Sequence, residues 1–323
     1  MAFVLVLLGL LWAPVSQALT FKAPVEETEW RLTPSIFECV FTQPIPHYGE
    51  AVFYHEAGED LVFRLRAKKN LMGEGGAALH IEPPVFAPGR YAEDLGSVQV
   101  KRGDPVLQVD AKRANRMMQA LIKGMQPTIT RRAYYDEGES IRVALSAARF
   151  ASFYQDYLGC VTGLLPVNFR QVEKNKILFT SAQTELSEDD KKQLDLIILY
   201  VKADPRVNAI YVDGHSDSLG RRYNNRRLSE DRANKVTNYL LKKGLNPQII
   251  TTRYHGERYP VASNKTKKGR DQNRRVTVRL ERIEEGAEAA ENPYPELEPA
   301  PSNNAFPSAD SVNVPEISLP AAQ

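Results

Sequence analysis

The chain has 323 residues, of which 42 are Lys or Arg, 40 are Asp or Glu, two are Cys and 42% are hydrophobic. This length and apolar fraction are typical of two globular domains, and they exclude a fibrous or wholly disordered chain. The net charge of +2 conceals an uneven distribution: residues 1–169 carry 17 basic and 18 acidic side chains, residues 170–280 carry 24 and 13, and residues 281–323 carry 1 and 9. The three segments therefore have net charges of −1, +11 and −8.

The chain begins with an uncharged apolar run that Pro14 interrupts and that ends in the small residues Ser16 and Ala18. This pattern predicts a secretory signal peptide, residues 1–18, cut after Ala18. The alternative is a membrane anchor, because no Lys or Arg precedes the apolar run as it does in a typical signal peptide. The run is marginal for an anchor, since a membrane span needs about 20 apolar residues. No Cys follows the cut, which excludes a lipoprotein, and no later segment reaches spanning length. We therefore expect an exported mature chain without a transmembrane segment.

Export changes the interpretation of the two cysteines, Cys39 and Cys160. In an oxidising compartment, an even number of cysteines favours a disulfide over free thiols. Closing a loop of this length stabilises a fold by roughly 4–5 kcal/mol in the chain-entropy model. The bridge would tie both ends of one domain together, so we expect a domain boundary near Cys160.

Residues 19–165 are predicted to form a β-rich domain of the barrel or sandwich type, with short helices. Short apolar or alternating runs, separated by Gly and Pro, lie at residues 36–41, 51–54, 61–65, 77–81, 98–100 and 106–109. This spacing is typical of antiparallel strands.

A helix follows these strands, because apolar residues from Ala114 to Ile122 recur at helical spacing between a capping Asp110 and a terminating Gly124. Two further strands at 128–134 and 141–145 and a short helix at 147–158 complete the predicted domain.

Residues 166–282 show a different pattern, in which strands alternate with amphipathic helices. Strands are predicted at 177–179, 209–212, 249–254 and 275–280. Ser187 is expected to cap the first helix, and the second is expected to start at Ser229 and to end at Gly244. The predicted order is β-α-β-α-β-β, so the whole chain is assigned to the α+β class. Residues 283–323 are acidic, rich in Pro and poor in large apolar residues, and are predicted to form a disordered tail.

The densest group of functional side chains lies in the second domain. Gly214, His215, Ser216 and Asp217 follow a strand, and Arg232 lies near the start of the next helix. A carboxylate and a guanidinium thus converge at one end of the sheet. Such a pair fits an amino-acid zwitterion, whose ammonium group would bind Asp217 and whose carboxylate would take a bidentate contact from Arg232.

Residues 177–280 resemble the OmpA-like peptidoglycan-binding domains. The resemblance is carried by four groups of residues: Gly-His-Ser-Asp at 214–217, Asn225 with Leu228-Ser229 and Arg232-Ala233, Gly256-Glu257 before Pro260, and Asn264 with Asn273-Arg274-Arg275. It implies that Asp217 and Arg232 hold the α-amino and α-carboxylate groups of diaminopimelate in the cell-wall stem peptide. The other candidate binding residues are Gly214, His215, Asn225, Leu228, Ser229 and Arg275. The resemblance implies neither catalytic residues nor a cofactor.

Each of these residues also has a purely structural interpretation. Asp217 could cap a turn, Arg232 could pair with an acidic neighbour on its own helix, and Asn225 could be a turn residue. His215 and Arg275 could be hydrogen-bonded packing residues.

The first domain resembles the amino-terminal domain of the MotY family of flagellar motor proteins. The shared residues are Glu38-Cys39, the segment from Pro44 to Phe53, Val143 to Ser146, and Gly159-Cys160. The resemblance implies a periplasmic protein of a Gram-negative bacterium, on the outer-membrane side of the envelope. Its implied partners are the flagellar basal body, a MotX-like ring protein where one is present, the motor stator complex and peptidoglycan.

Other function classes find less support in the sequence. His55-Glu56 begins like a zinc-protease motif, but the second His is absent, so no metal site is expected. A wall-targeted hydrolase would need a nucleophile or a metal cluster, and neither is evident. The basic second domain could suit nucleic acid, but an exported protein meets the anionic wall instead. A wall-anchored envelope protein unrelated to flagella remains the main alternative.

Overall fold

The computed structural model describes residues 18–84 and 89–283. Apart from Ala18, the predicted signal peptide lies outside the described residues, and so does the predicted acidic tail apart from Ile283. Within these two ranges, no helix is both long enough and apolar enough to cross a membrane.

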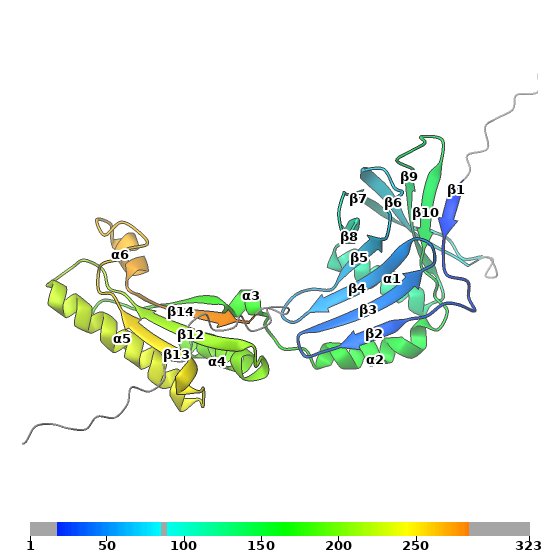
Figure 1. Cartoon of the computed structure of the whole chain (residues 1–323). Helices are drawn as coiled ribbons and strands as arrows, with labels where there is room; N and C mark the ends of the chain where they lie inside the picture. Colours follow the sequence, from blue (N-terminus) through cyan, green and yellow to red (C-terminus); the bar gives the residue numbers. More distant parts are fainter. Residues whose placement is uncertain (1–17, 85–88, 284–323) are drawn as a thin grey trace, which may run out of the picture. The chain divides into compact units, whose positions relative to one another are not determined.

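The first domain is built on one curved ten-stranded sheet (Figure 1). Its strands, in chain order, are β1 (Ala18–Phe21), β2 (Arg31–Pro34), β3 (Glu38–Ile45), β4 (Gly49–Glu56), β5 (Val62–Ala67), β6 (Gly75–Glu82), β7 (Glu93–Val100), β8 (Leu107–Val109), β9 (Gln126–Arg132) and β10 (Ser140–Ala144). They are arranged in the order β1-β10-β9-β6-β7-β8-β5-β4-β3-β2. The predicted β-rich fold class is confirmed, and each of the eight strands predicted from the sequence corresponds to a strand of this sheet.

Two strands at the edges of the sheet are absent from the sequence prediction. β1 and β2 have four residues each and are largely exposed, so neither shows the alternation of apolar and polar residues that identifies a half-buried strand. The pairing of β1 with β10 is parallel, whereas the expectation was a wholly antiparallel sheet. Edge strands of this kind add few buried side chains, which explains why the sequence pattern does not reveal them.

Two helices cover the core of the first domain. α1 (Ala111–Ile122) packs against β5 and β9, and α2 (Phe150–Thr162) packs against β2 and β3. The predicted caps of α1 are confirmed: the Asp110 side chain accepts a hydrogen bond from the Arg113 N–H, and Gly124 follows the helix with a positive φ of 76°. Trp30 lies in the core, with ring centroids 4.8 Å from those of both Phe41 and Phe150.

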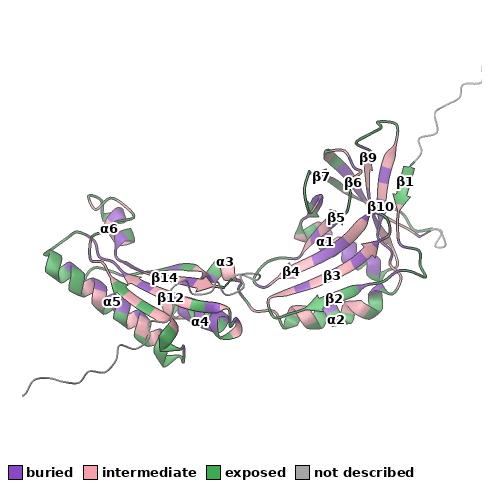
Figure 2. Cartoon of the chain, viewed as in Figure 1, coloured by how far each residue is buried: buried purple, intermediate pink, exposed green. Residues whose placement is uncertain are grey.

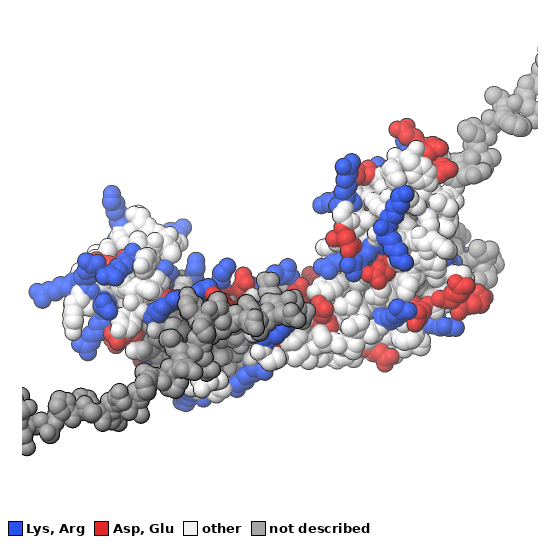
Figure 3. Space-filling view, in the orientation of Figure 1, with Lys and Arg blue, Asp and Glu red and all other residues white. Residues whose placement is uncertain are grey.

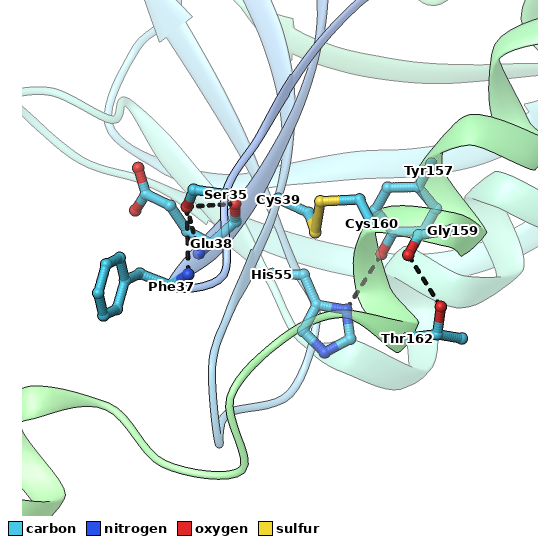
Figure 4. Close-up of a disulfide and its surroundings, with 9 residues drawn as sticks. All are labelled: Ser35, Phe37, Glu38, Cys39, His55, Tyr157, Gly159, Cys160 and Thr162. Atoms are coloured by element: carbon cyan, nitrogen blue, oxygen red, sulfur yellow. Dashed lines mark hydrogen bonds between the residues drawn. A yellow bond between two sulfur atoms is a disulfide. The ribbon is translucent and has the colours of Figure 1, made fainter. Parts of the chain in front are cut away.

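The predicted disulfide between Cys39 and Cys160 is present and joins β3 to α2 (Figure 4). Beside it, the Nδ1 atom of His55 and the hydroxyl of Tyr157 are 3.2 Å apart. His55 therefore contacts the aromatic core through Tyr157, and the described residues contain no group of three or more potential metal ligands.

The second domain has a four-stranded sheet, in the order β11-β14-β12-β13. Its elements are α3 (Phe169–Val172), β11 (Lys174–Leu178), α4 (Glu188–Ala203), β12 (Val207–Gly214), α5 (Arg222–Lys242), β13 (Ile250–Tyr254), α6 (Lys267–Asn273) and β14 (Arg275–Arg282). β12 runs parallel to β13 and antiparallel to β14. This is an OmpA-like α/β arrangement, and the predicted class is confirmed.

The helices of this domain agree with the prediction only in part. Ser187 caps α4 in a capping box with Asp190, as expected. α5, however, begins at Arg222, seven residues before the predicted start at Ser229, so Arg232 lies in the middle of the helix and not near its start. The Ser229 hydroxyl donates to the carbonyl of Arg226 inside the helix and therefore does not cap it. The short helix α6 has no apolar stripe, so the sequence pattern gives no sign of it.

The buried side chains of this domain lie between the sheet and its two long helices (Figure 2). α4 contributes Leu194, Ile197 and Ile198, and α5 contributes Val236 and Leu240. These residues fix both helices against the strands. The carboxyl end of β12 is thereby held against the middle of α5, at Ser229, which positions the predicted site.

Candidate functional site

Gly214 brings the carboxyl end of β12 into close contact with α5. A Cβ atom at this position would lie 2.1 Å from the main-chain oxygen of Ser229, so only glycine allows this approach. The next residues, His215 to Asp217, are buried. The predicted role of Gly214 as a binding residue is thus accompanied by a clear packing role.

Asp217 forms a buried ion pair with Arg274, a contact that was not predicted from the sequence. Its Oδ2 atom accepts a hydrogen bond of 2.7 Å from Nη1 of Arg274, and Oδ1 accepts one of 3.1 Å from the N–H of Leu219. The side chains of Asp217 and Arg274 are 9% and 11% exposed. Sequence reasoning included Arg274 in a motif but did not select it as a site residue.

Arg274 is held by several groups at once. Its Nε atom donates to the carbonyl of Phe179 at 3.1 Å, and Nη2 donates to the carboxylate of Asp271. Burial alone would lower the pKa of Arg274, but the hydrogen bonds that it donates to Asp217 and Asp271 outweigh this effect, so the pKa is raised. Arg274 is therefore a fixed cation beside Asp217.

Arg232 lies at the same site and is completely buried. Its Nε donates to the carbonyl of Gln183 at 2.9 Å and its Nη2 to that of Thr180 at 3.0 Å, while Nη1 lies 3.5 Å from the His215 carbonyl. Burial, with the nearby charge of Arg274, lowers the pKa of Arg232 to about 10, so the group stays charged at neutral pH. It does not pair with the acidic residues of its own helix, the alternative that the sequence left open.

Asn225 and Ser229 lie on α5 and hold the loop that follows β13. The Asn225 side-chain amide donates to Glu257 at 2.7 Å, and the Ser229 hydroxyl accepts from the N–H of Gly256 at 3.0 Å. Both residues are buried, whereas the neighbouring Leu228 is partly exposed. The structure thus gives Asn225 and Ser229 a positioning role beside the Asp217 cluster.

His215 and Arg275 also lie near the cluster without joining the Asp217 ion pair. Arg275 donates from Nη2 to the carbonyl of Tyr259 at 3.1 Å, and burial lowers its pKa. The ring of His215 stacks on that of His255 with 5.0 Å between centroids. Burial, assisted by the charges of Arg275 and His255, lowers the pKa of His215 to about 4. Its Nδ1 atom is buried and has no hydrogen-bond partner among the residues that the structure describes.

The cluster therefore combines one carboxylate and two guanidinium groups at the end of β12. The carboxylate suits an ammonium group, and guanidinium groups suit a carboxylate in bidentate geometry. Arg232 has five N–H donors, of which three are used in the bonds described above, and its side chain is completely buried. The arrangement is chemically suited to non-covalent binding of an amino-acid zwitterion.

Comparison with known proteins finds a matching family model for each domain. Residues 21–166 match the family model "MotY N-terminal domain", and residues 178–274 match "OmpA family". The chain is 28% identical over 268 residues to the "Sodium-type flagellar protein MotY" of Vibrio parahaemolyticus. The aligned residues make up 82% of this chain and 91% of that protein.

Two further relatives match the second domain alone. The "Probable lipoprotein YiaD" of Escherichia coli is 35% identical over 106 residues, which are 33% of this chain and about half, 48%, of that protein. Among solved structures, the C-terminal domain of Helicobacter pylori MotB aligns with a TM-score of 0.32 and 23% identity, covering 34% of this chain and 85% of that one.

Proposed function

We propose that this chain, which matches the MotY N-terminal domain over residues 21–166 and the OmpA family over residues 178–274, is a periplasmic structural protein that connects the flagellar motor to peptidoglycan. The structural motor role follows from the family. The association with the cell envelope is shared with the OmpA-like relatives. The contact with peptidoglycan and the residues that make it are our proposal.

The observation that carries the proposal is the buried cluster of Asp217, Arg274 and Arg232 within an OmpA-family domain. The free α-carbon of diaminopimelate in a stem peptide carries both an ammonium group and a carboxylate. We propose that Asp217 accepts hydrogen bonds from the ammonium group and that Arg232 donates to the carboxylate. Gly214, Asn225, Leu228, Ser229, His215 and Arg275 surround this contact and hold its loops in place.

The first domain, residues 19–165, is proposed to dock on the basal body. The predicted signal peptide would bring the chain to the periplasm, and the Cys39–Cys160 disulfide suits that oxidising compartment. A MotX-like ring protein and the stator complex are the proposed neighbours. Wall anchoring then transmits motor force to peptidoglycan without any catalytic step.

A deletion strain tests the flagellar role directly. We expect cells without this protein to keep their filaments and to lose swimming, and a fluorescent fusion to localise at the flagellar base. Normal swimming, with the fusion distributed evenly around the envelope, would instead support a general wall-anchored protein. New cleavage products in a muropeptide digest with the purified protein would support a hydrolase.

A further inference from the structure

Four loops of the first domain lie together at one end of its sheet, and they comprise residues 46–48, 68–74, 101–106 and 133–139. The antiparallel pairs β4–β5, β6–β7 and β9–β10 bring the ends of these loops to the same edge. The loop after β4 lies at the opposite end, where the Gly58 carbonyl accepts a hydrogen bond of 3.0 Å from Gln171 of α3. The four loops therefore form a distal end, away from the connection to the second domain.

A hollow of about 710 Å³ opens between three of these loops. Its lining includes Arg102, Arg132 and Tyr134. Hydrogen bonds between the loops fix its shape, because the N–H of Gly73 donates to the Arg132 carbonyl at 2.9 Å and the N–H of Tyr134 donates to the Leu71 carbonyl at 3.0 Å. Such a preformed surface favours association, since little conformational entropy is lost when a partner binds.

Much of the positive charge around this hollow is unpaired. Two of the acids at the distal end are engaged, because Asp104 pairs with Arg66 at 2.7 Å and Glu74 pairs with Arg102. Four exposed cations, by contrast, have no side-chain hydrogen bond or ion pair within the two described ranges, and these are Lys68, Lys69, Lys101 and Arg132. Their charges remain available to an acidic partner.

Two exposed tyrosines lie in the loop between β9 and β10 (Figure 1). Tyr134 and Tyr135 are 57% and 49% exposed, and their rings are in edge-to-face contact with 5.3 Å between centroids. Tyrosine is enriched in protein interfaces, because its ring supplies apolar area and its hydroxyl a hydrogen bond.

The next residues of the same loop, Asp136 and Glu137, are exposed acids. If the two tyrosines inserted into an anionic membrane, these carboxylates would meet the lipid phosphates. A folded protein can instead place its own acids opposite the lysines and its cations opposite Asp136 and Glu137. The distal end therefore suits an acidic protein surface better than a lipid surface.

We propose that the distal end of the first domain is the surface that docks on the basal body, and that it binds an acidic patch of a partner protein through its unpaired cations and the Tyr134–Tyr135 pair. This inference rests on the proposed function. It adds which surface of the first domain makes the contact and what chemistry the partner presents there.

The test is co-sedimentation of the full mature chain with basal bodies purified from a strain that lacks this protein. Lysozyme treatment of the basal bodies removes peptidoglycan, so the proposed wall contact of the second domain cannot contribute. Lys101→Glu combined with Arg132→Glu should weaken binding at least about tenfold at physiological salt, because both charges would then repel the partner. Tyr134→Ala combined with Tyr135→Ala should also weaken it about tenfold, and decides the test if the charge variant fails to fold.

The matched control is Lys112→Glu combined with Lys123→Glu. Both lysines are exposed, lie at the two ends of α1 and not in the four loops, and have no side-chain partner within the described residues. This variant has the same net charge as the first one, and its binding should stay within about twofold of the wild type.

Wild-type binding by folded variants of both kinds at the distal end would overturn the inference and leave the proposed function intact. An equal loss in the α1 control would overturn it too, because net charge alone would then explain the effect. The inference would also be wrong if the charge variant bound basal bodies normally but no longer bound vesicles of phosphatidylcholine and phosphatidylglycerol in equal amounts. If the wild type itself did not bind basal bodies, the docking role in the proposed function would fail.

Discussion

The Asp217 cluster shows how few residues determine the chemistry of the second domain. One carboxylate lies beside one guanidinium that it bonds directly, and a second, fully buried guanidinium donates to main-chain carbonyl oxygens. Burial makes these contacts stronger than they would be in water, and it makes any unpaired member costly. A ligand that breaks any of these bonds must therefore replace it to bind without a penalty.

The sequence predicted Asp217 and Arg232 but not Arg274, and the reason is local. Two adjacent arginines, Arg274 and Arg275, follow the short helix α6, and the end of that helix decides which of them faces Asp217. Because α6 has no apolar periodicity, the sequence predicts neither the helix nor the direction in which its last residues point. The complete burial of Arg232 could not be predicted from the sequence either, since it depends on the carbonyl groups of the loop that contains Thr180 and Gln183.

His215 should make the second domain more stable as the pH rises from about 4 to 6.5. Its pKa in the folded chain is lowered to about 4, so folding favours the neutral ring. The contribution of the neutral ring to the free energy of unfolding is fully present above the unfolded pKa of about 6.5, and it is lost as the pH falls towards 4. The change amounts to roughly 3 kcal/mol in the free energy of unfolding. An NMR titration of the imidazole protons measures the pKa directly.

His215→Phe provides the comparison for this prediction. Phenylalanine keeps a ring to stack on His255 but cannot titrate, so the stability of the variant should depend less on pH over the same interval. The groups around His215 that carry charge are Arg275, His255 and Asp213. A His215 titration near 6.5, or identical pH profiles for the two proteins, would contradict this account.

At the level of elements, the contact between β12 and α5 holds the site together. Gly214→Ala would place a methyl group 2.1 Å from the Ser229 oxygen and should separate the two elements. We expect the second domain to lose about 1–3 kcal/mol or more of unfolding free energy, which urea unfolding followed by far-UV circular dichroism would measure. Gly159→Ala is a useful contrast, because its methyl group would meet no atom within 4 Å inside α2. It should be neutral or slightly stabilising, so equal losses in both variants would contradict the packing argument.

The disulfide is the second element-level constraint, since it joins β3 to α2 across 121 residues. Replacing both cysteines by Ser should lower the unfolding free energy of the first domain by roughly 3–5 kcal/mol and leave the second domain unchanged. Fluorescence can follow this, because Trp30 is buried in the first domain and is the only Trp after the predicted cleavage site. The opposite result, a loss of stability in the second domain, would show that the bridge acts beyond its own domain.

The elements were predictable where local chemistry is strong. Asp110 and Ser187 cap α1 and α4 as expected, because a side-chain oxygen before an apolar stripe is a specific signal. The start of α5 was wrong by seven residues because Arg221 precedes it without any side-chain cap. The edge strands β1 and β2 escaped prediction because they bury little apolar surface.

At the scale of the whole molecule, positive charge is concentrated in the second domain (Figure 3). Exposed Lys265, Lys267 and Lys268 lie on and before α6, next to Asn264, whose side chain accepts a hydrogen bond from the Ser218 N–H beside Asp217. Long-range attraction between such a surface and an anionic wall accelerates encounter and is screened by salt.

Reversing these three charges tests that electrostatic contribution. The Lys265→Glu, Lys267→Glu and Lys268→Glu triple variant should associate with purified sacculi at least several-fold more slowly than the wild type at 20 mM salt, and equally fast at about 1 M salt, where the screening length is roughly 3 Å. Stopped-flow association with labelled sacculus fragments gives the rates. A difference that persists at high salt would indicate direct contacts instead of steering.

The measurement that tests the central claim most directly is co-sedimentation of the mature chain with purified sacculi. Asp217→Asn keeps the shape of the side chain but removes its charge. The charged hydrogen bond that it loses is worth about 1.5–3 kcal/mol, so binding should weaken about 10-fold to 100-fold. Asp189→Asn, which removes an exposed carboxylate on α4 that pairs with Lys192 outside the cluster, should bind like the wild type. If Asp217→Asn folded normally and bound sacculi as tightly as the wild type, the proposed wall-binding site would be wrong.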